Sequence, residues 1–323
     1  MPKVSVIVPI YGVEKYIERC CISLFEQTLD DMEFVFVNDK TKDKSISVLN
    51  DVLSRYPNRH SQVKIISHEV NRGLPQARKT GISYATGDYV AHCDSDDWVD
   101  TALYESLYKS AIAKGADIVV CDFLVNTYTS IEVRVGTRSN DINAYLRRLL
   151  FQLDPVSMVN KLIRRQVYAN DIIFPLENMG EDMATTLQLI YFCNKVVYTQ
   201  GVYYHYDGTT ESITRRPSKS ATLERALQAC RNLDLAIRFY KDSEDDDIKD
   251  GITHLKFMQR KLLMPIINYK DVYKIWAGIF PEINRDVLLK RSVAIRLIDR
   301  FKFFLTLIGV FPYVKEFMRE NLK

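Results

Sequence analysis

The sequence predicts an α/β fold, in which a largely parallel β-sheet is followed by a helical C-terminal region. Over residues 3–125, short apolar runs alternate with segments of helical periodicity, which is typical of βαβ units. From about residue 218 onward the periodicity is helical only. The strand runs lack a clean alternation of polar and apolar residues, so we expect helices on both faces of the sheet.

Each expected element has its own local signal. The strands are short runs rich in β-branched and aromatic residues, at residues 3–9, 33–37, 63–67, 88–93 and 117–125. The helices between them repeat apolar residues at three- and four-residue spacings, at residues 14–27, 45–56, 75–85 and 102–114. Further on, we expect helices at 144–153, at 159–168 and from Glu181, and one or two strands at 196–206.

A change of pattern divides the chain in two. The stretch 207–218 is polar and contains Pro217, which is typical of a linker. We therefore expect one domain over residues 1–215 and a helical region over residues 216–323. A chain of this length has room for one large unit and a smaller one.

The positive charge of the chain is concentrated at its C-terminal end. The net charge is +3, too small to indicate nucleic-acid binding. Residues 285–323 hold nine Lys/Arg and four Asp/Glu, a net of +5, which leaves 35 basic and 37 acidic residues elsewhere, a net of −2. Because 47% of the residues are hydrophobic, we expect a globular protein with this basic tail.

The cysteines and the chain start favour a cytosolic protein. The six Cys show no zinc-ligand spacing, so we interpret them as reduced core residues. The first residues lead straight into a strand pattern, without the features of a signal peptide. The longest strongly apolar run, residues 303–311, is well short of the roughly 20 residues that span a bilayer.

Polar residues follow three of the expected strands. Pro9 and Tyr11 mark the end of the first, Asp39 follows the second, and residues 94–97 (DSDD) follow the fourth. The carboxyl ends of strands are where ligands bind in open α/β sheets. We therefore expect an aromatic ring and several carboxylates to converge there.

The DSDD cluster has two interpretations. Three carboxylates in four residues repel one another unless a positive charge is present, and a hard divalent cation such as Mg²⁺ or Mn²⁺ suits them. Such an ion would neutralise charge on a departing diphosphate. Alternatively, Asp97 or Asp100 caps the following helix, because Asp is favoured at that position.

Two further segments carry the same kind of ambiguity. The helix expected after Gly73 offers free backbone N–H groups to an anion, and Arg78 adds a charge that can pair with phosphate; alternatively it is an ordinary helix with a solvent-facing Arg. Asp182 follows Glu181 at the start of another helix. Acidic residues there suit the helix dipole, and Asp182 is also a candidate general base for an acceptor hydroxyl.

The order of these motifs resembles the family 2 glycosyltransferases. The segments PIY, VNDKTKD, NRGLPQARKTG, DSDDW and GED occur in the order and spacing of that family, over roughly residues 1–215. The resemblance implies a GT-A fold, a nucleotide-sugar donor, usually a UDP-sugar, and an inverting mechanism. Such a direct displacement needs one base and a stabilised leaving group, with no protein nucleophile.

The resemblance also implies roles for individual residues on the donor side. Tyr11 and Asp39 would hold the base, with Pro9 shaping the pocket, and Arg78 would lie on the nucleotide side. The chain departs from the family pattern at Gly12, Lys40, Thr41 and Lys79, which lie beside the donor site and not at its carboxylates.

The remaining implied roles concern the diphosphate and the acceptor. Asp94 would contact the ribose or the metal, Ser95 would belong to the donor site, and Asp96 would ligate Mn²⁺ or Mg²⁺. Asp182 would be the catalytic base. His205 would complete the metal shell or touch phosphate; the alternative is an aromatic strand with a hydrogen-bonded histidine.

Two basic segments also have two interpretations each. Lys161 would face a sugar, or else belong to a solvated basic helix face. In the tail, Ile298, Phe301, Leu305 and Ile308 share a helical face beside Arg and Lys residues. Such a helix lies on an anionic membrane surface, or packs on the protein or a partner subunit.

The sequence thus predicts an inverting, metal-dependent transferase that moves a sugar to a glycan or lipid-linked acceptor, in surface polysaccharide synthesis. We expect it in the cytoplasm, with peripheral membrane contact through residues 293–323, and homo-oligomers are compatible with it. The alternative is a non-catalytic nucleotide-sugar-binding protein. A nucleotidyltransferase is disfavoured because a Gly-rich phosphate loop is missing after the first strand.

Overall fold

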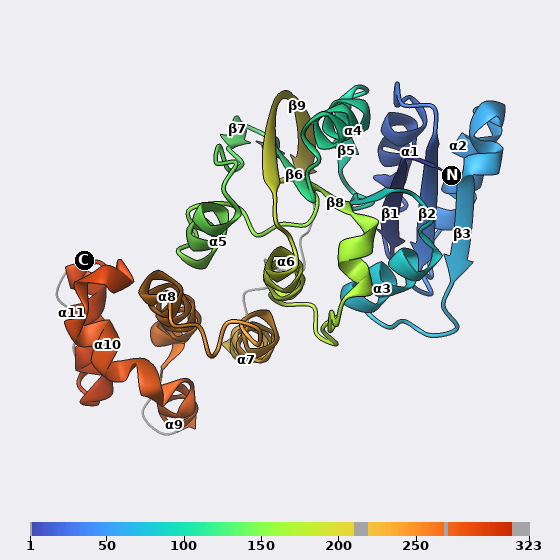
Figure 1. Ribbon diagram of the computed structural model, residues 1–323. Coiled ribbons are helices and arrows are strands. Elements are labelled where there is room, and N and C mark those ends of the chain that lie inside the picture. The colour runs from blue at the N-terminus through green and yellow to red at the C-terminus, as the bar shows by residue number, and fades with distance from the viewer. Residues whose placement is uncertain (1, 210–218, 268–270, 312–323) are drawn as a thin grey trace.

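A mixed β-sheet with helices on both faces forms the centre of the fold (Figure 1). The computed structural model describes residues 2–209, 219–267 and 271–311. Within those residues the sheet has nine strands, namely β1 (Val4–Ile10), β2 (Met32–Asn38), β3 (Val63–Ser67), β4 (Tyr89–His92), β5 (Trp98–Val99), β6 (Ile118–Asn126), β7 (Ile131–Arg134), β8 (Lys161–Arg164) and β9 (Val196–Asp207).

The strand order brings the expected strand ends together. Eight strands follow the order β3-β2-β1-β4-β8-β6-β9-β5, and β7 pairs with β6. As predicted, β3, β2, β1 and β4 are parallel neighbours. β8 is antiparallel to both β4 and β6 and joins this half of the sheet to the second half. The carboxyl ends of β1, β2 and β4 therefore share one edge, where such sheets bind ligands.

Helices cover both faces of the sheet, as the apolar strands predict. The described helices are α1 (Ile17–Phe25), α2 (Ser45–Ser54), α3 (Leu74–Tyr84), α4 (Leu103–Lys114), α5 (Ile142–Leu150), α6 (Glu181–Tyr191), α7 (Lys219–Ala236), α8 (Asp246–Leu263), α9 (Asp271–Gly278), α10 (Asn284–Leu289) and α11 (Leu297–Leu307). Helices α1, α2 and α4 pack on the face that carries Val4, Val6 and Val8. Helix α3 packs on the opposite face, against Ile7 and Val35.

Helix α3 lies very close to β1. A Cβ atom placed on Gly81 would lie 2.2 Å from Cγ2 of Ile7, so this contact depends on glycine. Arg78 lies three residues earlier, on the same side of the helix. The close approach at Gly81 therefore holds Arg78 against the edge of the sheet.

The expected helix at residues 159–168 is wrong. The segment forms β8 (Lys161–Arg164), which is inserted between β4 and β6, and a short 3₁₀ helix at Arg165–Ala169. Pairing with two strands that are distant in the sequence outweighs the local helical spacing. The short strands β5 and β7 were also not expected, because two and four residues give little periodicity.

The C-terminal helices share two apolar clusters. Leu233 and Ala236 of α7 join α5 and α6 in one cluster. Trp276 and Phe303 lie in a second cluster with residues of α8 and α10. The expected boundary between residues 215 and 216 lies outside the described residues. The division into two domains therefore stays a prediction.

Two other expectations concern the cysteines and the membrane. All six Cys are free and buried, which confirms them as core residues. Among the residues with described positions, no helix has both the length and the apolar character needed to cross a bilayer.

Candidate active site

The residues expected at the strand ends do meet at one edge of the sheet. Because β1, β2 and β4 are parallel neighbours, Tyr11, Asp39 and Asp94 all follow strands that end on the same side. The Tyr11 side chain is 54% exposed, so its ring face is open to a ligand. Asp39 is buried at the base of a loop.

Asp39 organises the loop that precedes α3. Its Oδ1 accepts hydrogen bonds from the backbone N–H of Arg72 (2.8 Å), and its Oδ2 accepts from that of Gly73 (2.8 Å). Asp39 Oδ1 also lies 2.7 Å from Nδ1 of His68, whose Nε2 lies 2.8 Å from the Thr80 hydroxyl. The sequence did not single out His68. The feature that could have indicated His68 is its position directly after the third expected strand.

The DSDD turn is fastened to both halves of the sheet. The Ser95 hydroxyl donates to the carbonyl oxygen of Pro9 at 2.6 Å, which fixes the turn to β1. The backbone N–H of Asp94 donates to the Tyr204 hydroxyl at 3.0 Å, which fixes it to β9. Ser95 is buried, so it acts on the site through the position of the turn.

Helix capping by Asp97 or Asp100 does not occur. Helix α4 has Ala102 at its N-cap, without a side-chain capping bond. Asp97 instead accepts from the Tyr204 hydroxyl at 2.6 Å and from the backbone N–H of Asp207 at 2.7 Å. Asp100 accepts from the backbone N–H of Tyr203 at 2.9 Å. Both aspartates accept hydrogen bonds from β9, a strand that lies about 100 residues later in the chain. Local sequence patterns could not predict that β9 lies beside them.

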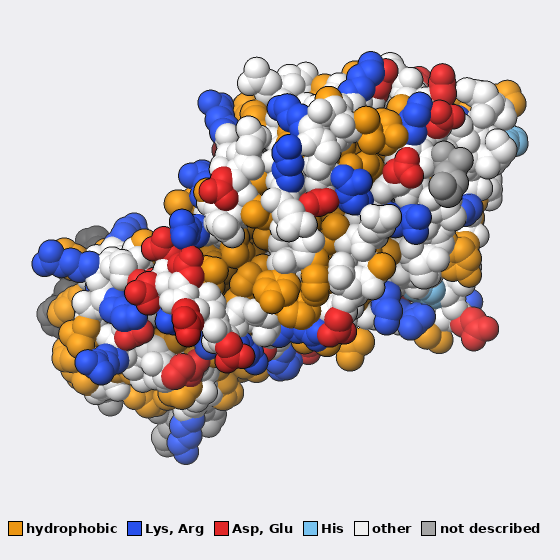
Figure 2. Space-filling model, in the orientation of Figure 1, with side chains coloured by type: hydrophobic (Ala, Val, Ile, Leu, Met, Phe, Trp, Pro, Cys, Tyr) orange, Lys and Arg blue, Asp and Glu red, His pale blue; other side chains and the backbone are white. Residues whose placement is uncertain are grey.

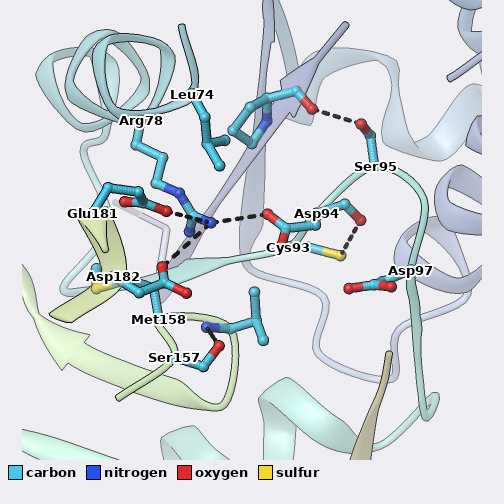
Figure 3. Close-up of polar contacts among 12 residues, drawn as sticks. Leu74, Arg78, Cys93, Asp94, Ser95, Asp97, Ser157, Met158, Glu181 and Asp182 are labelled. Atoms are coloured by element: carbon cyan, nitrogen blue, oxygen red, sulfur yellow. Dashed lines mark hydrogen bonds and ion pairs between the residues drawn. The ribbon is translucent and has the colours of Figure 1, made fainter. Parts of the chain in front are cut away.

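Arg78 joins the two acidic parts of the site (Figure 3). Its Nη2 lies 3.0 Å from Oδ1 of Asp94, 3.3 Å from Oε1 of Glu181 and 3.6 Å from Oδ1 of Asp182. The Arg78 side chain is only 2% exposed. The solvent-facing Arg of the alternative interpretation is therefore wrong, and the guanidinium faces protein carboxylates.

The electrostatics of this cluster leave negative charge in excess. Burial raises the pKa of Asp94 to about 6; Arg78 opposes this rise, and Asp96 and Asp182 add to it. Burial also raises the pKa of Glu181 well above its ordinary value, with Arg78 opposing and Asp182 adding. Burial lowers the pKa of Arg78, but the three carboxylates outweigh it, so that the pKa is raised overall. One guanidinium thus faces more carboxylates than it can neutralise.

Asp182 is the exposed carboxylate of its helix. Helix α6 starts after Gly180, whose φ of 77° is in the left-handed region that favours glycine. The next residue, Glu181, is buried, whereas the Asp182 side chain is 33% exposed. Asp182 lies beside the loop that contains Ser157 and Met158 (Figure 3). A carboxylate that is held by Arg78 and still reaches solvent has the form of a general base.

The sequence missed Arg19, which supports the DSDD turn from α1. Its Nη2 donates to the backbone carbonyl of Asp96 at 2.8 Å and pairs with Oδ2 of Asp207 at 2.5 Å. Its guanidinium lies 3.7 Å from the ring centre of Trp98. The other face of this stack is His205, whose ring centroid is 5.0 Å from that of Trp98.

His205 already has a protein partner. Its Nε2 lies 2.8 Å from Oδ1 of Asp100, which corresponds to the alternative of an aromatic strand with a hydrogen-bonded histidine. Residues 210–218, which follow this strand, lie outside the described residues.

Lys161 is buried in β8, so neither interpretation from sequence describes it. It is 1% exposed, and its Nζ donates to the carbonyl oxygens of Pro155 (3.0 Å) and Ser157 and to Oδ1 of Asn160 (2.9 Å). Burial lowers the pKa of Lys161 to about 8, against an opposing effect of Asp182. Lys161 thereby fixes the loop beside Asp182.

The carboxylates fit a divalent ion that is bound together with a diphosphate. In the described part of the chain, no group of three or more His, Cys, Asp or Glu side chains is placed to hold a metal alone. Mg²⁺ usually needs only one or two carboxylates, with substrate phosphates and water completing its shell. Asp94 and Asp96 would supply such a pair. Burial is the main cause of the raised pKa of Asp94, and the charges of Asp96 and Asp182 add to it.

Comparison with known proteins identifies the class to which this fold and site belong. The model of glycosyl transferase family 2 matches residues 5–171, more than half of the chain. The chain belongs to glycosyl transferase family 2.

Individual relatives agree with this assignment. The putative glycosyltransferase EpsH of Bacillus subtilis (strain 168) is 30% identical over 227 residues, which are 68% of this chain. The chain spans only 64% of the length of EpsH.

Solved structures show that the fold is GT-A. TarS 1-349 of S. aureus, in complex with UDP, has a TM-score of 0.70 at 18% identity and matches 99% of this chain and 92% of its own. The mannosyltransferase PcManGT of Pyrobaculum calidifontis, in complex with GDP-Man and Mn²⁺, has a TM-score of 0.57 at 17% identity and matches 99% of this chain and 88% of its own.

Proposed function

We propose that this protein is an inverting glycosyltransferase that moves a sugar from a UDP-sugar to a hydroxyl of a surface glycan or of its lipid-linked precursor. The observation that carries the proposal is the placement of Asp182. This partly exposed carboxylate is tied through Arg78 to Asp94, on the turn that the donor diphosphate would approach. A direct displacement needs one such base on the acceptor side.

The proposed reaction is a single displacement. Asp182 takes the proton of the acceptor hydroxyl while the hydroxyl oxygen attacks the anomeric carbon, and the bond from that carbon to the UDP oxygen breaks. Glu181 is buried beside Asp182, and its raised pKa favours the neutral form, so that Asp182 is the carboxylate available as base. Lys161 and Arg78 hold the surroundings of this base in place.

The donor is proposed to lie along the carboxyl edge of β1, β2 and β4. Tyr11, with its exposed ring, and Asp39 would hold the base, and Pro9 would form the wall. Arg78 would act on the donor side through Asp94. The UDP-bound state of TarS supports a uridine nucleotide.

Asp94 and Asp96 would hold Mn²⁺ or Mg²⁺. The ion would supply positive charge to the departing diphosphate. The Mn²⁺ in PcManGT supports this proposal, and so does the excess of negative charge around Asp94. We propose that the protein acts in the cytoplasm, where nucleotide-sugar donors are present.

Calorimetric titration with UDP tests the donor site. We expect UDP to bind in the presence of Mn²⁺, and to bind at least about tenfold more weakly without Mn²⁺ or to Asp96→Asn. Asp171→Asn serves as a control, because that aspartate is exposed. Binding of GDP in preference to UDP would overturn the donor class, and absence of nucleotide binding would overturn the transferase proposal.

A turnover assay separates the enzyme from its alternative. A nucleotide-sugar-binding protein without activity would bind UDP and Mn²⁺ but would not release UDP from any donor, even slowly to water. Screening UDP-sugars for metal-dependent UDP release therefore decides between the two, and also identifies the donor sugar.

A further inference from the structure

Helix α11 packs on the protein through one face. Phe303 and Thr306 are fully buried. The Phe303 ring contacts those of Phe257 and Trp276, at centroid distances of 5.6 and 5.3 Å. Arg300, on the same side, donates to the backbone carbonyl of Ile295 at 3.1 Å and to that of Val287. These contacts fix the orientation of the helix on the chain.

The opposite face of α11 is apolar and exposed. The large side chains on it recur at helical spacing and form one stripe, with exposed fractions of 84% for Leu297, 52% for Ile298, 57% for Phe301, 43% for Phe304 and 53% for Ile308. Leu305, which belongs to the same stripe, is partly buried. Over the described part of the tail, residues 293–311, one face of α11 packs on the protein and the stripe is exposed. The rest of the predicted tail, residues 312–323, lies outside the described residues.

Positive charge borders this stripe. Residues 285–311 include six Lys/Arg and two Asp/Glu, a net of +4. Five of the basic residues are exposed, namely Arg285, Lys290, Arg291, Arg296 and Lys302. Lys290 pairs with Asp250 and Asp286, and Arg296 pairs with Asp299. Figure 2 shows hydrophobic, basic and acidic side chains together at the end of the molecule that carries α9, α10 and α11. The combination matches the composition of helices that lie in the headgroup region of anionic membranes.

We propose that the exposed stripe of α11 docks the protein onto the surface of an anionic lipid bilayer. The apolar side chains enter the boundary between headgroups and acyl chains, and the neighbouring cations meet the lipid phosphates. The 11 residues of α11 extend over about 16 Å, too short to cross a bilayer, so the helix lies in the plane of the membrane.

Charge favours a membrane over a second copy of the chain as the occupant. A two-fold interface places the same surface of both copies together, so that the two basic borders would repel each other. An anionic bilayer instead supplies opposite charge along the whole stripe. Figure 1 also places α11 at the end of the molecule opposite β3, so docking leaves the site edge between α3 and α6 uncovered.

Vesicle co-sedimentation of the full chain tests the proposal without any turnover, so its outcome does not depend on the proposed transferase function. The vesicles are phosphatidylcholine alone, or an equimolar mixture with phosphatidylglycerol. The test variant is Ile298→Ser/Phe301→Ser. The matched control is Tyr128→Ser/Ile131→Ser, which removes two exposed apolar side chains, 88% and 67% exposed, from the β6–β7 hairpin.

We expect the wild type and the control to bind the anionic vesicles. The test variant should bind them at least about tenfold more weakly. Lys302→Gln should weaken binding to the anionic vesicles only. Equal binding of the test variant and the wild type would overturn the proposal, and so would absence of vesicle binding. The latter, combined with a dimer by light scattering that the test variant loses, would assign the stripe to self-association. Unchanged thermal unfolding of each variant confirms that the exposed substitutions leave the fold intact.

Discussion

Arg78 shows how one buried side chain can join parts of a site that are remote in sequence. It comes from α3, Asp94 from the turn after β4, and Glu181 and Asp182 from α6. Removing one partner of a buried ionic group leaves the others uncompensated, which costs far more than losing a surface pair. The position of the proposed base therefore depends on this guanidinium.

The first prediction concerns the stability that Arg78 provides. We expect Arg78→Met to lower the free energy of unfolding by about 3 kcal/mol, because Asp94 and Asp182 lose the cation that they share. Chemical denaturation at neutral pH measures this. Arg55→Met is the control: Arg55 pairs with Glu18 at the surface, where both side chains are more than half exposed, and a loss of about 1 kcal/mol or less is expected. Equal losses in the two variants would contradict the central role of Arg78.

The second prediction concerns Asp182. Asp182→Asn keeps the shape of the side chain but removes its capacity to take a proton, so we expect kcat to fall about 1000-fold. The affinity for UDP with Mn²⁺ should stay within about twofold of the wild type, since the residue acts on the acceptor. Parallel assays of UDP release and UDP binding check both parts. A variant that loses UDP binding to the same extent would place Asp182 in the donor site instead.

At the scale of elements, the site depends on how closely α3 and β8 are set into the sheet. Gly81 brings α3 onto Ile7, and β8 brings the loop next to Asp182 between β4 and β6. Both features position side chains through the backbone. They are therefore tested by substitutions that touch no proposed ligand or catalytic group.

The third prediction is that Gly81→Ala destabilises the protein by about 1–3 kcal/mol, because the added methyl group overpacks against Ile7. Gly278→Ala, where an added Cβ meets open space, should change stability by less than about 0.5 kcal/mol. Combining Gly81→Ala with Ile7→Ala should cost less stability than the sum of the two single substitutions, because removing the Ile7 side chain makes room for the added methyl group. If the double variant shows only the sum of the two single losses, the contact is not the cause.

The fourth prediction uses the lowered pKa of Lys161. Below pH 8 this lysine is charged in both the folded and the unfolded chain, and the cost of burying the charge is fully present. Between pH 8 and its ordinary value of 10.5, the folded protein loses the proton first and the cost falls. The stability of the wild type relative to Lys161→Met should therefore rise by about 3 kcal/mol across that interval. Denaturation at several pH values measures the rise, and the exposed Lys114→Met should show none.

At the scale of the whole molecule, three groups of apolar contacts run from the sheet to the last helices. Helices α1 to α4 pack on the sheet, α5 to α8 share a cluster beside it, and the cluster around Trp276 is built from the C-terminal helices. The residues of the candidate site lie on the sheet and on α3 and α6, and none of them lies in the cluster around Trp276. A ligand of the site should thus stabilise the sheet and the helices packed on it more than the helices of the Trp276 cluster.

The fifth prediction is that calorimetric unfolding shows two transitions, and that UDP with Mn²⁺ raises the midpoint of only one. Binding to the folded state stabilises the cooperative unit that contains the site, by about 2.7 kcal/mol at a hundredfold excess over Kd. Removing Mn²⁺ with EDTA should abolish the increase. A single transition that moves as a whole on ligand addition would show that the proposed domains at 1–215 and 216–323 unfold as one unit.

The sequence by itself determined the alternating elements of the first 125 residues and the family, because both depend on local periodicity and on motifs at fixed spacing. It also indicated which polar residues would meet, since parallel strands end on one edge. Roles within the site were decided only by the tertiary structure. Contacts between distant segments explain the burial of Arg78, the strand that contains Lys161, the support by Arg19 and the partners of Asp97. Local sequence patterns cannot predict such contacts.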